Sequence, residues 1–290
     1  MTPRSRPLYF EGRHGRLYGV HHAPTNVGGP AHAVLLLPPL GQEYKRCHKT
    51  LQKLAQDLAT AGFHTLRFDY AGSGDSGELA SWSLDTWRQD GQDALAWLRG
   101  TSGAKMVSAV GVRLGAAVAL ALDTPLEHLV LWDPVVDGSA YLESLDRLNR
   151  ELLHRFRHAY RNGSAVSFPP EQLIGHPFPD TMRESLAAYS LVIPDQPPAR
   201  HALWIDTPTG ATESRKDAHR NPGAGAGEAA DPVKESYSGH LALAEEFLHV
   251  EARCRWHSAM EIENVIMGQP VTRHMLQWFK QADGFHGNGA

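Results

Sequence analysis

A Gly-x-X-x-Gly turn at residues 111–115 is the feature of this sequence that bears most directly on chemistry. The apolar run KMVSAV predicts a β-strand before the turn, and the Ala-rich run AAVALAL predicts a helix after it. In a strand–turn–helix unit of this kind, a serine between the two glycines is a nucleophile held at the tip of a sharp bend. The residue between Gly111 and Gly115 is here Arg113, flanked by Val112 and Leu114.

Arg113 cannot perform the chemistry of such a serine. A guanidinium stays protonated at any useful pH and has no lone pair with which to attack a carbonyl. A mechanism in which a hydroxyl adds to a substrate carbonyl therefore has no first step at this turn. The sequence contains no other Gly-x-Ser-x-Gly, and we interpret Ser73 and Ser76 of the AGSGDSG segment as turn residues.

Three roles are open for Arg113. In the first, the side chain is structural and pairs with Asp133 or Asp137, because a buried charge without a partner is very costly. In the second, the guanidinium anchors the carboxylate or phosphate of a small ligand beside electropositive helix N-termini. In the third, it polarises a substrate carbonyl while His257 or an aspartate activates water.

Alternating strands and helices must position these residues. The predicted strands are two within 8–22, then 33–37, 63–68, 106–110, 128–132, 199–205 and 249–255. The predicted helices are 47–61, 84–99 with Ser83 as its N-cap, 114–122, 139–160, 181–190, 234–247 and 270–281. This alternation favours an α/β fold with a mostly parallel, doubly wound sheet that carries helices on both faces.

We expect residues 1–290 to form a single domain, since this length suits one sizeable core. Residues 139–196 stand between two predicted sheet strands and are expected to form an inserted helical cap over the site. Residues 209–232 are polar and Gly/Ala-rich, and cannot bury enough apolar surface to offset their ordering entropy. We therefore expect a mobile loop there.

Composition and charge exclude several classes of function. The chain is 42% hydrophobic, has a formal net charge of −4 and contains no basic run, so no nucleic-acid partner is predicted. The start of the chain has no apolar signal segment, which predicts a cytoplasmic protein. The most apolar stretch, 106–122, is interrupted by Arg113 and predicts no membrane span. The seventeen histidines are scattered and form no HExxH motif, so neither a metal nor another cofactor is predicted, and no feature specifies an oligomeric state.

Several segments resemble serine-aminopeptidase-type members of the α/β-hydrolase superfamily. They are PPLGQEYKRCHKTL, AGFHTLRFDYAGSGDSG and LVLWDPVVDG. The segments LWDPVVDGSAYLESL and LIGHPFPDTMRESLAAYSL, together with an arginine in the elbow turn, are similar to a bacterial subgroup that includes the exosortase A system-associated hydrolases. The resemblance extends over about residues 30–200. It implies the α/β-hydrolase fold, whereas activity has to be argued from the site.

The resemblance also implies roles for individual residues. An oxyanion hole would use the backbone N–H of Leu114 and one from the Leu40–Gly41 region, and neither donor depends on a side chain.

The acid of a catalytic triad would be Asp206, which follows the predicted strand 199–205, with Asp133 and Asp137 as alternates. The histidine would be His257, with His240 as a weaker candidate.

These observations predict a hydrolase-family protein that lacks the serine nucleophile and is non-catalytic or atypical. Its expected partner is a small acyl- or anion-bearing molecule. The alternative is an active hydrolase of ester or amide bonds that works through a non-standard site.

Overall fold

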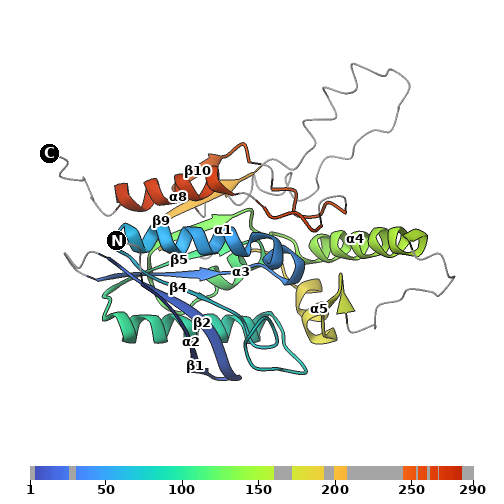
Figure 1. Cartoon of the computed structure of the whole chain (residues 1–290), viewed down its shortest axis with the longest axis horizontal. Helices are drawn as coiled ribbons and strands as arrows, with labels where there is room; N and C mark the ends of the chain where they lie inside the picture. The colour runs from blue at the N-terminus through green and yellow to red at the C-terminus, as the bar shows by residue number, and fades with distance from the viewer. Residues whose placement is uncertain are drawn as a thin grey trace, which may run out of the picture.

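An eight-stranded sheet forms the centre of the described part of the protein, in the order β1-β2-β4-β3-β5-β6-β9-β10 (Figure 1). The coordinates are a computed structural model. They describe residues 4–25, 31–159, 172–192, 199–207, 244–252, 254–259, 262–266 and 268–282. The strands are β1 (Arg4–Gly12), β2 (Gly15–Ala23), β3 (His32–Leu37), β4 (His64–Phe68), β5 (Met106–Val112), β6 (Leu126–Trp132), β9 (Ala199–Asp206) and β10 (Glu246–His249). β2 runs antiparallel to β1 and β4, and the other neighbours pair in parallel.

Helices cover both faces of this sheet (Figure 1). One face carries α1 (Gly41–Thr60) and α8 (Gln269–Ala282), and the other carries α2 (Leu84–Ser102) and α3 (Leu114–Leu120). Each face has its own cluster of buried apolar side chains. β3 and β5, at the centre of the sheet, are almost entirely buried, as expected for parallel strands covered on both sides.

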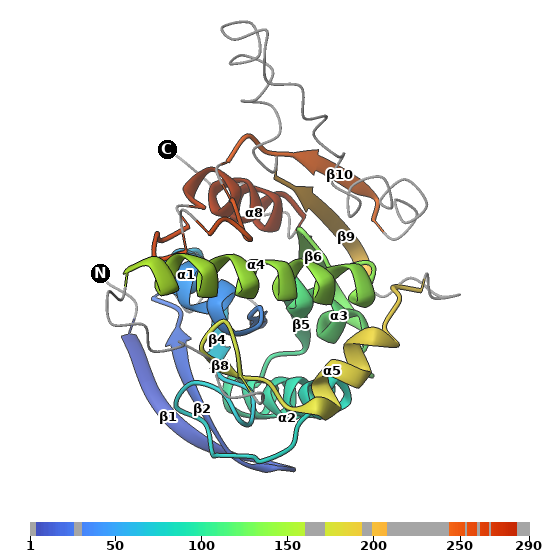
Figure 2. The same ribbon diagram turned by 90° about the vertical axis from the view of Figure 1, so that its right-hand side faces the viewer.

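A helical segment joins β6 to β9 and crosses the carboxyl ends of the parallel strands. Figure 2 shows α4 (Gly138–Ala159) in front of those strand ends, with α5 (Asp180–Ala187) beside it. The short antiparallel pair β7 (Gln172–Leu173) and β8 (His176–Pro177) lies between the two helices in the chain. Residues 160–171 and 193–196 of the expected cap lie outside the described residues.

Most predicted elements correspond to observed ones, and Ser83 caps α2 by accepting a hydrogen bond from the Thr86 N–H. Two predictions near the C-terminus are wrong. The predicted helix 234–247 is wrong at its end, where residues 246 and 247 belong to strand β10, and the predicted strand 249–255 is misplaced, since β10 ends at residue 249. Residues 234–243 and the expected loop 209–232 lie outside the described residues.

Helix α1 begins at Gly41, six residues before the predicted start. The apolar periodicity begins only at residue 47 because the first turns carry polar side chains. Two of those polar side chains, Glu43 and Arg46, are nevertheless buried and contact the C-terminal loop. Arg46 donates from Nη1 to the carbonyl oxygens of Arg255 (2.6 Å) and Trp256 (2.8 Å), and from Nε to that of Asn264 (3.0 Å).

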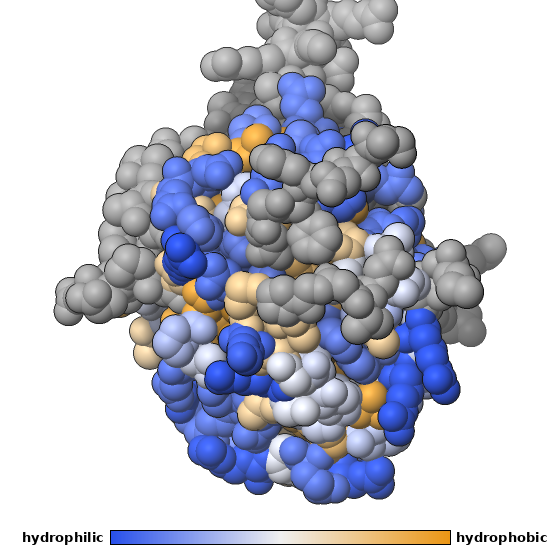
Figure 3. All heavy atoms as spheres, turned by 90° about the vertical axis from the view of Figure 1, so that its left-hand side faces the viewer, coloured by the Kyte–Doolittle hydropathy of each residue, from blue (hydrophilic) through white to orange (hydrophobic). Residues whose placement is uncertain are grey.

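Figure 3 shows the side of the molecule opposite α4 and α5, where hydrophilic side chains predominate and apolar ones lie between them. Within the described residues, no helix combines the length and the apolar character that crossing a membrane requires.

Candidate functional site

Arg113 lies at the bend between β5 and α3, with φ 53° and ψ −120°. A positive φ is uncommon for a residue with a side chain and costs about 1–3 kcal/mol. A Cβ atom on Gly111 would lie 2.5 Å from the Ala116 Cα, and one on Gly115 would lie 2.2 Å from the Leu37 carbonyl oxygen. At Gly111 the strand β5 lies against α3, and at Gly115 the helix lies against the end of β3, so closely that only glycine fits at either position.

The guanidinium of Arg113 is buried and ion-paired. Its Nε donates to Oε1 of Glu43 at 3.1 Å, and its Nη1 donates to the backbone carbonyl of Asp133 at 3.0 Å. The guanidinium carbon also lies 5.6 Å from the ring centroids of Tyr141 and Trp256, within cation–π range. The side chain is therefore held by the protein itself rather than presented to solvent.

Glu43 is the centre of this network and is only 3% exposed. Besides Arg113, its carboxylate accepts hydrogen bonds from Tyr141 Oη at 2.8 Å and from His257 Nε2 at 2.9 Å. Burial by itself would raise the pKa of Glu43. The Arg113 charge and the hydrogen bonds from His257 and Tyr141 outweigh burial and lower that pKa to about 2. Glu43 also lies in the first turn of α1, where the helix dipole favours an anion.

His257 links Glu43 to the cap helix. Its Nδ1 lies 3.1 Å from Ser144 Oγ on α4, and the hydroxyl of Ser144 also lies 2.6 Å from the Tyr141 carbonyl oxygen. Ser144, His257 and Glu43 thus form a hydroxyl–imidazole–carboxylate chain, whose carboxylate is the ion-pair partner of Arg113 and in which Asp206 takes no part.

Asp133 is a second buried carboxylate near the guanidinium. It accepts hydrogen bonds from the Thr207 N–H at 2.7 Å, from the Thr207 hydroxyl and from Trp256 Nε1 at 2.8 Å. Burial raises its pKa, although these donors and the Arg113 charge act in the opposite direction. Asp133 therefore accepts a hydrogen bond from Arg113 with its backbone carbonyl. Its carboxylate binds Thr207, the residue after β9, and Trp256 in the C-terminal loop.

The structure does not bring the expected triad acid and histidine together. Asp206 pairs with Nδ1 of His249 at 2.9 Å, and His257 pairs with Glu43. Asp137 accepts a hydrogen bond from the Ala140 N–H at 2.8 Å in the first turn of α4. The other histidine considered, His240, lies outside the described residues.

The expected oxyanion-hole residues lie beside the Glu43 network. Leu40 and Gly41 lead into α1, and Leu114 is the first residue of α3. The cavity between Leu40, Gly41, Glu43 and His257 has a volume of only about 20 Å³. That volume admits about one water molecule and leaves no room for an acyl group.

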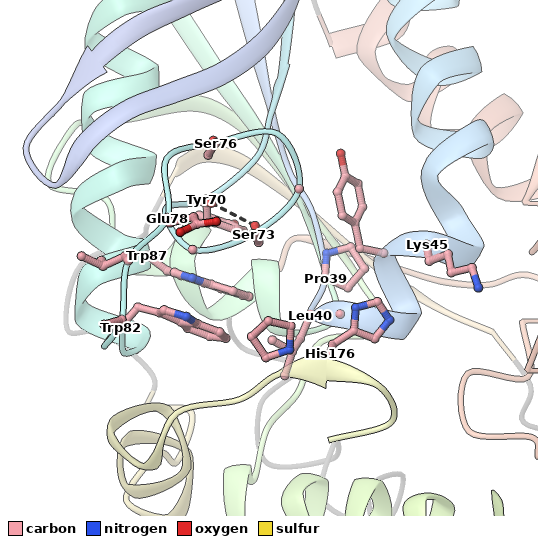
Figure 4. A pocket seen from close by; sticks show the side chains of 17 residues that line it. Pro39, Leu40, Lys45, Tyr70, Ser73, Ser76, Glu78, Trp82, Trp87 and His176 are labelled. Carbon is pink, nitrogen blue, oxygen red and sulfur yellow. Dashed lines mark hydrogen bonds between the residues drawn. The ribbon is translucent and has the colours of Figure 1, made fainter. Parts of the chain in front are cut away.

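A much larger cavity, of about 850 Å³, lies next to this small one (Figure 4). Leu40, Gly41, His176 and Pro177 line both cavities and form the wall between them. The other lining residues of the large cavity include Tyr44, Tyr70, Ser73, Glu78, Trp82 and Trp87. The room for a ligand thus lies beside the bend at Arg113 and not over it.

A group with potential metal ligands lies at the other end of the sheet. Glu127, His128 and His201 place ligand atoms within 4.8 Å of one another. Glu127 forms an ion pair with Arg200 at 3.2 Å, and His201 Nδ1 lies 3.1 Å from Oε2 of Glu245. Glu127 and His201 thus already have protein partners, and we assign no metal role to the group.

Sequence reasoning missed Glu43 and Tyr141. It sought the partner of Arg113 only after the neighbouring strand, at Asp133 and Asp137. A usable signal was present, because Glu43 follows the Leu40–Gly41 region that was already expected to face the elbow.

Neither a family model nor a curated protein sequence matches this chain. Solved structures do match. An esterase from Pyrococcus furiosus has a TM-score of 0.58 at 13% identity, covering 97% of this chain and 92% of that chain. A proline iminopeptidase-related protein from Thermus thermophilus has a TM-score of 0.55 at 18% identity, with coverages of 97% and 98%. A serine hydrolase without a lid from Xanthomonas campestris has a TM-score of 0.52 at 15% identity, with coverages of 99% and 97%. The chain has the α/β-hydrolase fold.

Proposed function

We propose that this protein is a member of the α/β-hydrolase superfamily that lacks the serine nucleophile and binds a small acyl-bearing molecule without hydrolysing it. The observation that carries the proposal is the ion pair at the elbow. Arg113 lies at the tip of the bend, and its guanidinium donates to Glu43 at 3.1 Å. A cationic side chain with this partner supplies no electron pair for attack on a carbonyl.

The surroundings of Arg113 favour the structural role over the anchoring role. Glu43 already supplies the carboxylate that an anionic ligand would otherwise present to the guanidinium. An external carboxylate or phosphate would have to displace Glu43 from three hydrogen-bond donors. We therefore propose an acyl group, and not an anion held by Arg113, as the feature of the ligand that the protein recognises.

The chain Ser144–His257–Glu43 supports a second candidate function, a hydrolase with a displaced nucleophile. In this alternative, His257 accepts the Ser144 proton while Glu43 stabilises the resulting imidazolium. It ranks second for two reasons. The Ser144 hydroxyl also lies 2.6 Å from the Tyr141 carbonyl, and the adjoining cavity of about 20 Å³ has no room for a substrate.

Esterase turnover and active-site labelling test the proposal. The purified protein is incubated with p-nitrophenyl acetate and butyrate and with a fluorophosphonate probe, and labelled residues are identified by mass spectrometry. We expect no saturable turnover and no labelled serine. Saturable turnover with labelling of any serine would overturn the proposal. Loss of both signals in Ser144→Ala would then establish the second candidate, and Ser73→Ala is the matched control.

A further inference from the structure

The cavity of about 850 Å³ has the size of a site for a drug-sized molecule. It lies outside the Glu43 network, and neither Glu43 nor Arg113 lines it. A ligand can therefore occupy this cavity without disturbing the ion pair at the elbow.

The aromatic part of the lining is closed to a ligand. Tyr70, Trp82 and Trp87 are only 1–3% exposed. Trp87 stacks on Tyr70 with ring centroids 4.1 Å apart and on Trp82 at 5.3 Å, so its ring is covered by its neighbours. These rings support the wall of the cavity, and the surface that a ligand can touch comes from the other lining residues.

Apolar side chains supply part of that accessible surface. Leu79 is half-buried, Ala80 and Pro177 are exposed, and all three line the cavity. An apolar group that packs against these side chains is removed from water, which stabilises the complex in proportion to the buried area. The body of a suitable ligand is therefore apolar.

The accessible hydroxyl groups of the lining already donate their protons within the protein. Tyr44 donates to Oδ1 of Asp69 at 2.7 Å, and Ser73 donates to the Tyr70 carbonyl oxygen at 2.9 Å. Ser76 donates to the carbonyl oxygen of Asp69. Because a hydroxyl has one proton and two lone pairs, these oxygens are left to accept hydrogen bonds from a ligand and not to donate them.

His176 is likewise left as an acceptor. Gln42 donates from Nε2 to the Ile262 carbonyl oxygen at 2.7 Å, so the other terminal atom of its amide, Oε1, is an acceptor. That oxygen lies 3.0 Å from Nε2 of His176, which therefore carries the imidazole proton. Burial lowers the pKa of His176, so the ring is neutral at pH 7 and Nδ1 has no proton.

Glu78 adds a negative charge to this set of acceptors. Its side chain is exposed, and it forms no ion pair or hydrogen bond with the part of the chain that the structure describes. Lys45 is the one lysine or arginine among the described lining residues, and it pairs with Glu263 at 3.1 Å. Figure 4 shows Lys45 on the opposite side of the cavity from Glu78, with its amino group directed away. Acceptors beside a carboxylate complement a group that is cationic and donates hydrogen bonds.

We propose that this cavity binds an organic cation, namely a protonated amine carried on an apolar body. The ammonium group pairs with Glu78, and the body packs against Leu79, Ala80 and Pro177. This inference goes beyond the proposed function, because Arg113 and Glu43 take no part in it and the ligand needs no acyl group.

Three probes with the same phenylbutyl body test the charge of the ligand: 4-phenylbutylamine, 4-phenylbutan-1-ol and 4-phenylbutyrate. Dissociation constants are measured by equilibrium dialysis at pH 7 and low ionic strength, because salt screens exposed charges. An exposed ion pair contributes modestly, so we expect the amine to bind saturably and about four-fold more tightly than the alcohol. The carboxylate should bind more weakly than both because Glu78 repels it.

Glu78→Gln removes the charge and keeps the shape of an exposed side chain, so the variant should fold. We expect it to reduce the preference for the amine over the alcohol to about two-fold or less. Glu151→Gln, at an exposed glutamate of α4 that does not line the cavity, is the matched control and should keep the full preference.

The proposal is overturned if no probe binds saturably, if the alcohol or the carboxylate binds as tightly as the amine, or if Glu78→Gln keeps the preference. Because dialysis does not depend on turnover, labelling of a serine would refute the proposed function and leave this result interpretable.

Discussion

Replacing Glu43 by glutamine isolates the ion pair on which the elbow depends. The substitution keeps the shape of the side chain and removes its charge. Arg113, at 6% exposure, would then be a buried cation that has lost the Glu43 carboxylate from its set of partners. Removing one partner of a buried ion pair costs about 3–5 kcal/mol, because the remaining charge has lost its compensation.

The lowered pKa of Glu43 gives a second, independent value for this loss of stability. That pKa is lowered from 4.5 to about 2, and each pKa unit corresponds to about 1.36 kcal/mol. The folded state therefore gains about 3 kcal/mol from ionised Glu43, in agreement with the first figure. Because the folded pKa is the lower one, this stability is present above pH 4.5 and is lost as the pH falls toward 2. The stability difference between wild type and Glu43→Gln should shrink over the same range.

Urea unfolding followed by tryptophan fluorescence, at intervals between pH 7 and pH 3, measures this difference directly. We expect Glu43→Gln to lower the free energy of unfolding by about 3 kcal/mol at pH 7 and by clearly less at pH 3. The double variant Arg113→Met/Glu43→Gln is the control, and should recover much of the loss because it removes both charges. A loss below about 1 kcal/mol at pH 7, or a loss that does not change with pH, would refute the account of the network.

Three further outcomes follow from other parts of the structure. Burial and a neighbouring arginine lower the pKa of His22 from 6.5 to about 4, so protons bind preferentially to the unfolded state and stability falls as the pH drops from 6.5 to 4. His22→Gln should flatten that part of the urea midpoint–pH curve, and an unchanged slope would contradict the assignment. Tyr70→Phe should raise the thermal midpoint of the ligand-free protein, since it removes a buried hydroxyl without a partner, at a gain of about 1 kcal/mol. Gly115→Ala should unfold the protein or destabilise it by more than about 2 kcal/mol through the clash with Leu37. Gly100→Ala, with nothing within 4 Å of the new Cβ, should leave the melting temperature unchanged or raise it; equal effects of the two alanines would contradict the close approach at the elbow.

The local parts of the fold could be predicted from sequence because their causes are local. The glycines at 111 and 115 mark a bend that side chains would block, and the apolar run before them predicts a buried strand. Ser83 before an amphipathic segment predicts a helix start in the same way. The start of α1 was missed because its first turn is polar, and a polar turn is ordinarily exposed. Here Glu43 and Arg46 are buried against a loop more than 200 residues away in the sequence.

Tertiary structure alone decided which residues meet. The sequence places an arginine at the bend, and a buried guanidinium needs a partner. From the sequence alone, however, several acidic residues are equally suitable partners. The convergence of α1, α4 and the C-terminal loop selects Glu43, and it gives His257 to Glu43 and Ser144 while Asp206 takes His249. Partner choice depends on distances of about 3 Å between segments far apart in the chain, and such distances arise only from packing. The same packing fills the space over the elbow and leaves the large cavity beside it, lined by the Tyr70–Trp87–Trp82 stack.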